Sequence, residues 1–200
     1  MTEPQTLRSM AGAPADPARL GDAVVIIIDA QNEYVSGALP LPGVEEALAE
    51  IDALLTKARS AGAPVIHVKH IGAAGSAFDP DDPRGDFAEG AKPLPGEAIV
   101  EKRLPNAFAD TNLGVRLTAS GKKKLIVAGF QTHMCISSTV RAATDAGYDS
   151  TVIASACATR DLPSSDGSSA VSAKDIHEIS LASLADRFAV IAPYTDVILL

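Results

Sequence analysis

The chain has 200 residues, of which 46% are hydrophobic and 21% are charged, and its formal net charge is −8. This length and balance are typical of one globular domain with a sizeable core. The acidic charge and the lack of a lysine- or arginine-rich stripe argue against nucleic acid as a partner. No apolar run reaches the ~20 residues of a membrane-spanning helix, so no membrane partner is expected.

The chain contains two cysteines, Cys135 and Cys157, which lie in separate predicted strand–helix units. Two such residues do not make a disulfide framework or a zinc ligand set, so we expect a reducing, cytoplasmic location. The N-terminal segment has several prolines among small residues and no apolar signal-peptide core. We expect residues 1–20 to form a loose arm and residues 21–200 to form the domain.

Six apolar segments have the length and composition of β-strands. In chain order they span residues 23–28, 64–70, 98–102, 124–128, 150–154 and 188–191. Between them, helical periodicity or helix-start signals predict helices. These predicted helices span residues 44–61, 111–121 and 172–186, and one more begins at residue 132.

Strands that alternate with helices predict a mainly parallel sheet with right-handed crossovers. We therefore predict a single α/β domain built as a three-layer sandwich, with helices on both faces of a six-stranded sheet. Residues 71–96 contain many Gly, Pro and Asp residues and little periodicity, which predicts a long and functional loop. Residues 159–171 predict a second polar loop.

Cys135 is predicted to lie in the first turn of the helix that begins near Thr132, just beyond a buried strand. Open α/β sheets bind their ligands at this edge. Unpaired backbone N–H groups and the helix dipole there lower the pKa of a thiol. Taken alone, Cys135 is equally typical of a small buried side chain at a helix start.

Two charged residues also end predicted strands: Asp29 follows the first strand and Lys102 closes the third. If these strands neighbour the strand before Cys135, the three side chains meet at one edge. Asp29 would then take the thiol proton and return it to a leaving amine, while Lys102 keeps both groups charged. Taken singly, Asp29 is also typical of a turn, and Lys102 of a solvated charge.

Such a group supports nucleophilic catalysis. The Cys135 sulfur would attack an acyl carbon and form a thioester, which water then cleaves. Backbone N–H groups at the turn before Cys135 would hold the oxyanion.

Four segments, in order and spacing, resemble the isochorismatase-like cysteine hydrolase superfamily. This superfamily includes nicotinamidases, carbamoylsarcosine and ureidoacrylate amidohydrolases, and isochorismatases. The segments that carry the resemblance are residues 29–34, 101–108, 129–135 and 156–161. The resemblance extends over most of the predicted domain.

The resemblance implies an Asp–Lys–Cys triad, which maps onto Asp29, Lys102 and Cys135, and a sheet order near 3-2-1-4-5-6. It also implies a cis peptide bond at Phe130–Gln131. That bond would turn the Gln131 N–H inward beside the Cys135 N–H, and the two would form the oxyanion hole. Relatives are usually homo-oligomers, so we expect a dimer or tetramer.

Four more residues are candidates for lining the substrate pocket: Gln31, Tyr34, Phe108 and His133. Tyr34 and Phe108 occupy positions that form an apolar wall in relatives, and His133 lies two residues before the nucleophile. Each has a structural alternative, as a core aromatic, a turn histidine or, for Gln31, a cap of the loop.

Metal-binding nicotinamidases carry an Asp-x-His arrangement that the segment from His67 to His70 lacks. These two histidines fall on opposite faces of a strand and do not easily share one ion. No Gly-x-Gly-x-x-Gly or P-loop motif occurs. We therefore expect no metal and no cofactor.

The main functional prediction is a metal-independent hydrolase that cleaves a non-peptide C–N bond in a small amide, ureido or carbamoyl compound. Two alternatives remain open. One is a vinyl-ether hydrolase of the isochorismate type, in which Asp29 acts as the acid. The other is a non-catalytic binding protein that carries a reactive thiol.

Overall fold

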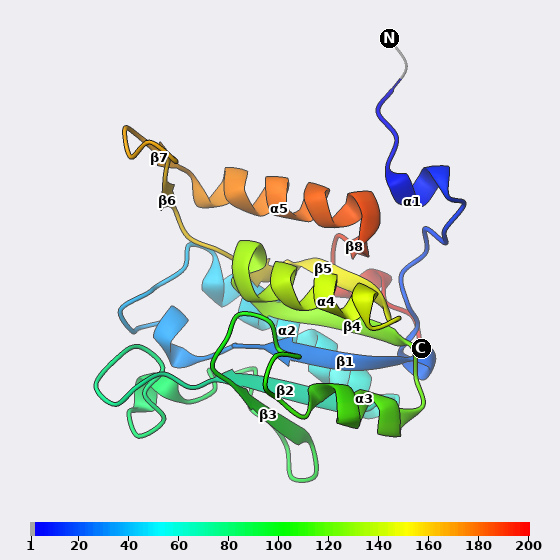
Figure 1. Cartoon of the computed structure of the whole chain (residues 1–200). Coiled ribbons are helices and arrows are strands. Elements are labelled where there is room, and N and C mark those ends of the chain that lie inside the picture. The colour runs from blue at the N-terminus through cyan, green and yellow to red at the C-terminus, as the bar shows by residue number, and fades with distance from the viewer. Residues whose placement is uncertain (1–2) are drawn as a thin grey trace.

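The computed structural model describes residues 3–200, and a six-stranded parallel sheet forms its middle layer (Figure 1). Its strands run in the order β3-β2-β1-β4-β5-β8. They are β1 (Ala23–Ile28), β2 (Val65–His70), β3 (Ala98–Lys102), β4 (Lys124–Phe130), β5 (Asp149–Ala158) and β8 (Ala189–Ala192). Because β8 is the sixth strand of this sheet in chain order, the expected order 3-2-1-4-5-6 is confirmed.

Helices cover both faces of the sheet and make three layers. Helix α2 (Val44–Ser60) lies on one face. Helices α3 (Leu113–Ser120), α4 (Ser137–Asp145) and α5 (Ala173–Arg187) lie on the other, nearer the viewer in Figure 1. This arrangement confirms the predicted α/β sandwich.

The central strand β1 is apolar throughout because it is buried on both faces. Its side chains alternate across the sheet: Val24, Ile26 and Ile28 pack under α3, α4 and α5. Val25 and Ile27 pack under α2. The two resulting cores hold the carboxyl end of β1 rigidly in the middle of the sheet.

The segment after β4 differs from the predicted helix. Residues 132–136 form a π-helical turn, and α4 begins only at Ser137. The Gln131 carbonyl accepts hydrogen bonds from the N–H groups of both Met134 and Ile136, which widens the turn. Wide turns of this kind are frequent at functional sites. Cys135 therefore lies in this turn and not in the first turn of the α-helix.

Two other predicted segments differ in detail. Strand β5 continues to Ala158, four residues beyond its predicted end. Within the predicted polar loop 159–171, β6 (Leu162–Pro163) and β7 (Ala170–Val171) form a small antiparallel hairpin. The hairpin leads into α5, which Ser172 caps by accepting a hydrogen bond from the Asp175 N–H.

Part of the predicted arm contacts the domain, while residues 1 and 2 lie outside the described residues. Helix α1 (Leu7–Met10) lies beside the end of α5 (Figure 1). The Leu7 N–H donates to Asp186 Oδ1 at 2.9 Å, and Arg8 pairs with Asp149 at 3.0 Å.

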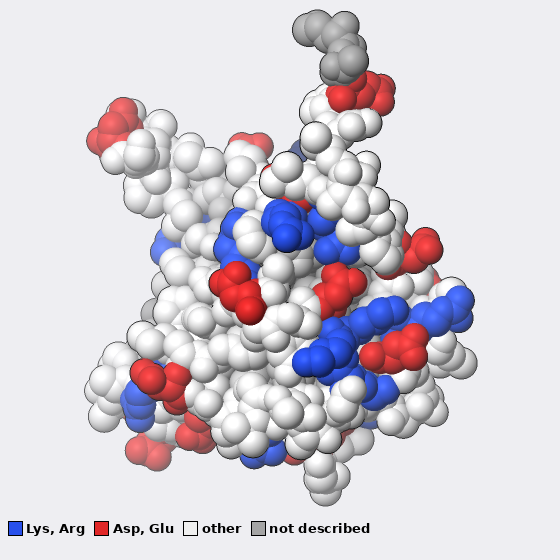
Figure 2. Space-filling view, turned by 45° about the vertical axis from the view of Figure 1, so that its right-hand side comes forward, with Lys and Arg blue, Asp and Glu red and all other residues white. Residues whose placement is uncertain are grey.

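The described surface mixes charges. Figure 2 shows lysines and arginines in short groups bordered by acidic residues on the face in view. Within residues 3–200, none of the helices has both the length and the apolar character needed to cross a lipid bilayer.

Candidate active site

The carboxyl ends of three strands bring Asp29, Lys102 and Cys135 together. Asp29 follows β1, Lys102 closes β3, and Cys135 lies in the turn after β4. Strand β2 separates β1 from β3, so the Lys102 side chain reaches across the end of β2. The three residues are 0%, 2% and 5% exposed, respectively. The site is thus a nearly water-free cluster of a carboxyl, an ammonium and a thiol.

The Lys102 ammonium is the centre of this cluster. Its Nζ lies 2.7 Å from Asp29 Oδ2 in an ion pair and 3.3 Å from Cys135 Sγ. It also lies 3.1 Å from His70 Nδ1. An ammonium has three N–H groups, so each has a neighbouring acceptor. The contact with Asp29 meets the distance of an ion pair but not the angles of a hydrogen bond.

Neither carboxylate oxygen of Asp29 therefore accepts a well-aligned hydrogen bond from residues 3–200. Burial raises the pKa of the Asp29 carboxyl, and the charge of Lys102 acts in the opposite direction. A buried carboxylate with a raised pKa beside the thiol is a good proton acceptor.

The Cys135 thiol differs from its sequence-based expectation. Burial, followed by the Asp29 charge, raises the pKa of the thiol to about 12, although Lys102 acts to lower it. The lowered pKa expected from the helix start is therefore wrong, because desolvation and the neighbouring carboxylate outweigh the local N–H groups. The thiol is protonated at neutral pH, with Asp29 as the adjacent base.

The backbone is unusual where β1 and β4 end. Asp29 has φ 51°, a left-handed conformation that a short polar side chain tolerates. Gly129 has φ 123°, and a Cβ there would lie 2.0 Å from the Ile28 carbonyl oxygen. Only glycine allows this close approach of β4 to β1. The Phe130–Gln131 peptide bond is cis, as the resemblance implies.

Aromatic rings pack beside the triad. Tyr34 is buried and packs edge-on against Phe78 and Phe130, with ring centroids 5.1 and 5.8 Å away. Phe78 also packs against His70 at 5.1 Å. Burial, then the negative charge of Asp29, raises the pKa of Tyr34, so its hydroxyl stays neutral. Sequence reasoning missed Phe78, whose only signal was its place in the loop 71–96.

Two buried nitrogen atoms, one on His133 and one on Arg160, lack protein partners within residues 3–200. His133 Nδ1 contacts Thr159 Oγ1 at 2.5 Å, whereas its Nε2 is buried and unpaired. Arg160 Nε is also buried and unpaired. Burial and then the Arg160 charge lower the pKa of His133, which keeps the ring neutral. Sequence reasoning included Arg160 in a motif without giving it a role.

The structure gives two of the other candidates packing positions. The Gln31 amide donates to the carbonyls of His70 and Gly85 at 3.0 and 2.7 Å and accepts from the His70 N–H at 2.8 Å. Its polar atoms are therefore engaged by backbone. Phe108 packs at 6.2 Å against Tyr148, which precedes the amino end of β5. That Gln31 and Phe108 line the substrate pocket stays a prediction.

The two histidines of β2 have separate partners. His67 is buried and bonds Glu97 at 2.9 Å, whereas His70 faces Lys102. Among residues 3–200, no group of three or more His, Cys, Asp or Glu side chains is arranged to hold a metal ion.

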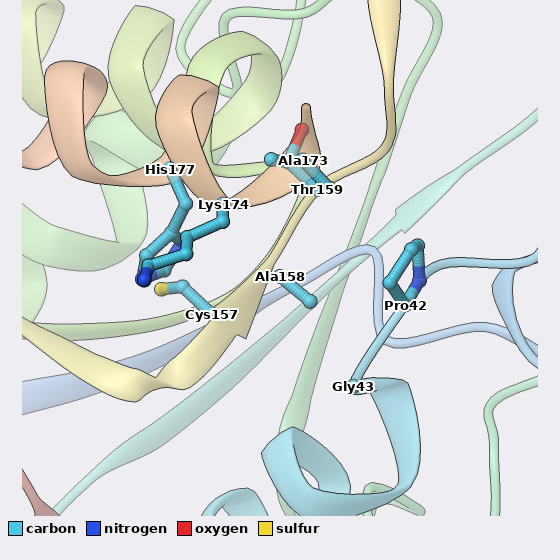
Figure 3. Close-up of a pocket in the computed structure, with 8 residues that line it drawn as sticks. All are labelled: Pro42, Gly43, Cys157, Ala158, Thr159, Ala173, Lys174 and His177. Carbon is cyan, nitrogen blue, oxygen red and sulfur yellow. The ribbon is translucent and has the colours of Figure 1, made fainter. Parts of the chain in front are cut away.

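A pocket of about 270 Å³ lies between the end of β5 and the start of α5. Figure 3 shows Cys157, Lys174 and His177 directed toward one another in it. Burial raises the pKa of the Cys157 thiol to about 12, and no carboxylate or ammonium of the triad is among the groups that shift it. Thr159 lines the pocket and also contacts His133, so it lies between the pocket and the turn that carries Cys135.

Comparisons with known proteins agree with this fold. The Isochorismatase domain model matches residues 23–196. The crystal structure of an isochorismatase from Pseudomonas putida KT2440 is 47% identical and superposes with a TM-score of 0.93, covering 98% of this chain and 100% of that chain. The secreted isochorismatase effector Isc1 of Verticillium dahliae is 37% identical over 193 residues, which are 96% of this chain and 98% of that protein.

A streptothricin hydrolase of Streptomyces noursei is 35% identical over 165 residues, which are 82% of this chain and 57% of that protein. The matching relatives also include amidohydrolases. The family match spans most of the chain, and several of the curated relatives are hydrolases. The chain therefore belongs to the isochorismatase family and is a hydrolase.

Proposed function

We propose that this enzyme hydrolyses a non-peptide C–N bond of a small amide, ureido or carbamoyl compound through a thioester on Cys135. One observation carries the proposal: the Lys102 ammonium lies 2.7 Å from the Asp29 carboxylate and 3.3 Å from the Cys135 sulfur. Acyl transfer needs a nucleophile, a base and a fixed positive charge together. The amidohydrolases among the matching relatives support the same chemistry.

In the first half of the reaction Asp29 takes the thiol proton, and the Cys135 sulfur attacks the acyl carbon. The C–S bond forms as the carbonyl electrons move to oxygen. The backbone N–H groups of Gln131 and Cys135 stabilise this oxyanion. The C–N bond then breaks, and the leaving nitrogen takes the proton from Asp29.

In the second half Asp29 accepts a proton from water, whose oxygen attacks the thioester carbon. The C–S bond breaks, the proton returns to the sulfur, and the carboxylic or carbamic acid leaves. Lys102 remains charged throughout and compensates whichever of Asp29 and Cys135 carries the negative charge. Tyr34, Phe78 and His133 line the substrate in this proposal.

The experiment is a panel of small amide, ureido and carbamoyl compounds with ammonia detection. Cys135→Ala should lower turnover by about three orders of magnitude or more, because no thioester forms. Cys157→Ala is the matched control and should retain activity. Far-ultraviolet circular dichroism should show the same fold for both variants.

Full turnover by Cys135→Ala on a substrate of the wild-type enzyme would refute the thioester route. If Asp29→Asn abolishes hydrolysis of a vinyl ether while Cys135→Ala retains it, the isochorismate-type reaction replaces this proposal.

The proposed setting is a homo-oligomer in the cytoplasm. Cys135 and Cys157 are both free thiols, and the thioester route requires Cys135 to stay reduced. Leu104 and Met134 are exposed apolar side chains close in sequence to Lys102 and Cys135, and they are candidates for an interface beside the site.

A further inference from the structure

The acceptors around the Lys102 ammonium differ in what happens to them during turnover. In the proposed reaction Asp29 gains and loses a proton, and the Cys135 sulfur becomes a thioester. Both therefore change charge while Lys102 must stay in place. The third acceptor, His70 Nδ1 at 3.1 Å, forms no bond in that reaction. A lysine side chain is long and flexible, so a constant acceptor restricts it.

We propose that His70 is a positioning residue, whose unprotonated Nδ1 anchors the Lys102 ammonium between Asp29 and Cys135 throughout the catalytic cycle. The inference rests on the proposed function for its kinetic consequence, but the anchoring itself is a property of the free enzyme.

His70 is well placed to act as an anchor because it is itself held on several sides. It pairs with Lys102 in the register of β2 and β3. Its backbone N–H and carbonyl are both bonded to the Gln31 amide. Its ring packs against Phe78 at 5.1 Å. These contacts fix the position of the ring independently of Lys102.

The protonation state of His70 suits this role. Only a neutral imidazole with a bare Nδ1 can accept a hydrogen bond from an ammonium. Burial, then the charges of Lys102 and Arg103, lowers the pKa of His70 to about 4. The ring is therefore neutral at physiological pH, and the contact with Lys102 selects the tautomer that carries its proton on Nε2.

The same strand offers a matched control. His67 also lies on β2 and is fully buried, but it bonds Glu97 and makes no contact with the triad. A substitution of His67 disturbs the strand at least as much as one of His70. It leaves the Lys102 acceptors untouched.

The test compares His70→Asn and His70→Leu. Asparagine places its amide oxygen near the position of Nδ1 and keeps an acceptor, whereas leucine removes it. We expect His70→Leu to lower kcat about tenfold or more with little change in KM, and His70→Asn to restore kcat to within about threefold. His67→Leu should leave kcat near that of the wild type.

Equal losses of kcat in His70→Asn and His70→Leu would overturn the proposal, as would an unchanged kcat in His70→Leu. A loss of kcat in His67→Leu equal to that in His70→Leu would also overturn it, because the effect would then come from the strand.

A second measurement needs no substrate. The chain has four histidines, so ¹⁵N ring spectra are simple to assign by the signal that disappears in His70→Asn. We expect His70 to give the neutral tautomer with a bare Nδ1 at about pH 7. An Nδ1-protonated or doubly protonated ring would refute the anchor even if amide hydrolysis is confirmed. If His70 has the expected tautomer but the enzyme hydrolyses no amide, the proposed function is refuted and the anchoring role of His70 is not.

Discussion

The protonation states at the triad are set by the residues themselves and not by solvent. Asp29 and Lys102 form an ion pair that water does not reach, and the thiol of Cys135 lies beside it. The carboxylate opposes ionisation of the sulfur, while the ammonium favours it. Burial contributes most to the raised pKa of the thiol, and the same carboxylate that accepts the thiol proton adds to it.

This opposition predicts an unusual result for Asp29→Asn. Removal of the carboxylate charge leaves Lys102 unopposed, so the pKa of the Cys135 thiol should fall below about 12. Alkylation of Cys135 by iodoacetamide at about pH 7 should become at least about tenfold faster. Amide hydrolysis should nevertheless fall about 10²–10⁴-fold, because the general base is gone. Mass spectrometry of the Cys135 peptide measures the alkylation.

Cys157 is the internal control in the same sample. Its raised pKa comes from burial, so its alkylation should not change in Asp29→Asn. Slower alkylation of Cys135 in the variant would show that Asp29 does not oppose the thiolate.

At the scale of elements, the site depends on how closely β4 approaches β1. The two strands pair from Ala23 and Lys124 up to Ile28 and Gly129. Immediately beyond this last pair, Asp29 leaves β1 in a left-handed conformation. The chain of β4 continues into the turn that carries Cys135. The last residue pair of the ladder therefore determines the separation of the base and the nucleophile.

Gly129→Ala should destabilise the protein by about 2–4 kcal/mol, because a Cβ would lie 2.0 Å from the Ile28 carbonyl oxygen and φ is 123°. Activity of the folded fraction should also fall, because β4 must move away from β1. Urea denaturation measures the first effect.

Gly114→Ala is the matched control for this prediction. Gly114 lies within α3, and a Cβ there would meet only Phe108, at 3.9 Å. The free energy of unfolding should stay the same or rise by up to about 1 kcal/mol. Equal effects at Gly114 and Gly129 would mean that close strand approach is not the cause.

At the scale of the whole molecule, one ionic cluster ties the α2 layer to the sheet edge. Arg59 of α2 donates to both carboxylate oxygens of Glu97 at 2.8 and 2.9 Å, and His67 of β2 bonds the same carboxylate. Glu97 precedes β3, the strand that ends at Lys102. The cluster therefore joins the amino end of β3 to α2 and β2, at the opposite end of that strand from Lys102.

This cluster predicts a pH dependence of stability. Although burial acts to raise it, hydrogen bonds from Arg59, Leu94 and His67 lower the pKa of Glu97 to about 2, from 4.5. Because the pKa of Glu97 is lower in the folded state than in the unfolded state, the ionised carboxylate stabilises the fold fully above about pH 4.5. This stabilisation is lost as the pH falls from about 4.5 toward about 2. The free energy of unfolding of Glu97→Gln should therefore be about 1 kcal/mol below that of the wild type at neutral pH. Solvent screening keeps this difference small.

The difference in free energy of unfolding between the wild type and Glu97→Gln, measured by urea denaturation, should become smaller as the pH is lowered through this range. Glu101→Gln, at an exposed position on β3, should show no such narrowing. A constant difference at all pH values would mean that the Glu97 charge contributes nothing.

Much of this protein follows from local sequence patterns. The doubly buried run 23–28 and the amphipathic stripe of α2 have periodicities that any packing of this chain must satisfy. Alternation of strands and helices then restricts the topology to a parallel sheet. This is why Asp29, Lys102 and Cys135 could be assigned to one sheet edge, although the strand order itself came from the family resemblance.

Only the tertiary structure decided the environment of these groups. Burial of Cys135 beside Asp29 reverses the expected shift of its thiol pKa, because desolvation depends on every layer packed around the sulfur. Phe78 reaches the site from a loop without periodicity, and His70 meets Lys102 through strand register. Local patterns determine which face of a helix or strand a side chain occupies. The distances between side chains from distant segments depend on how the whole chain packs, and the protonation states of those side chains depend on these distances.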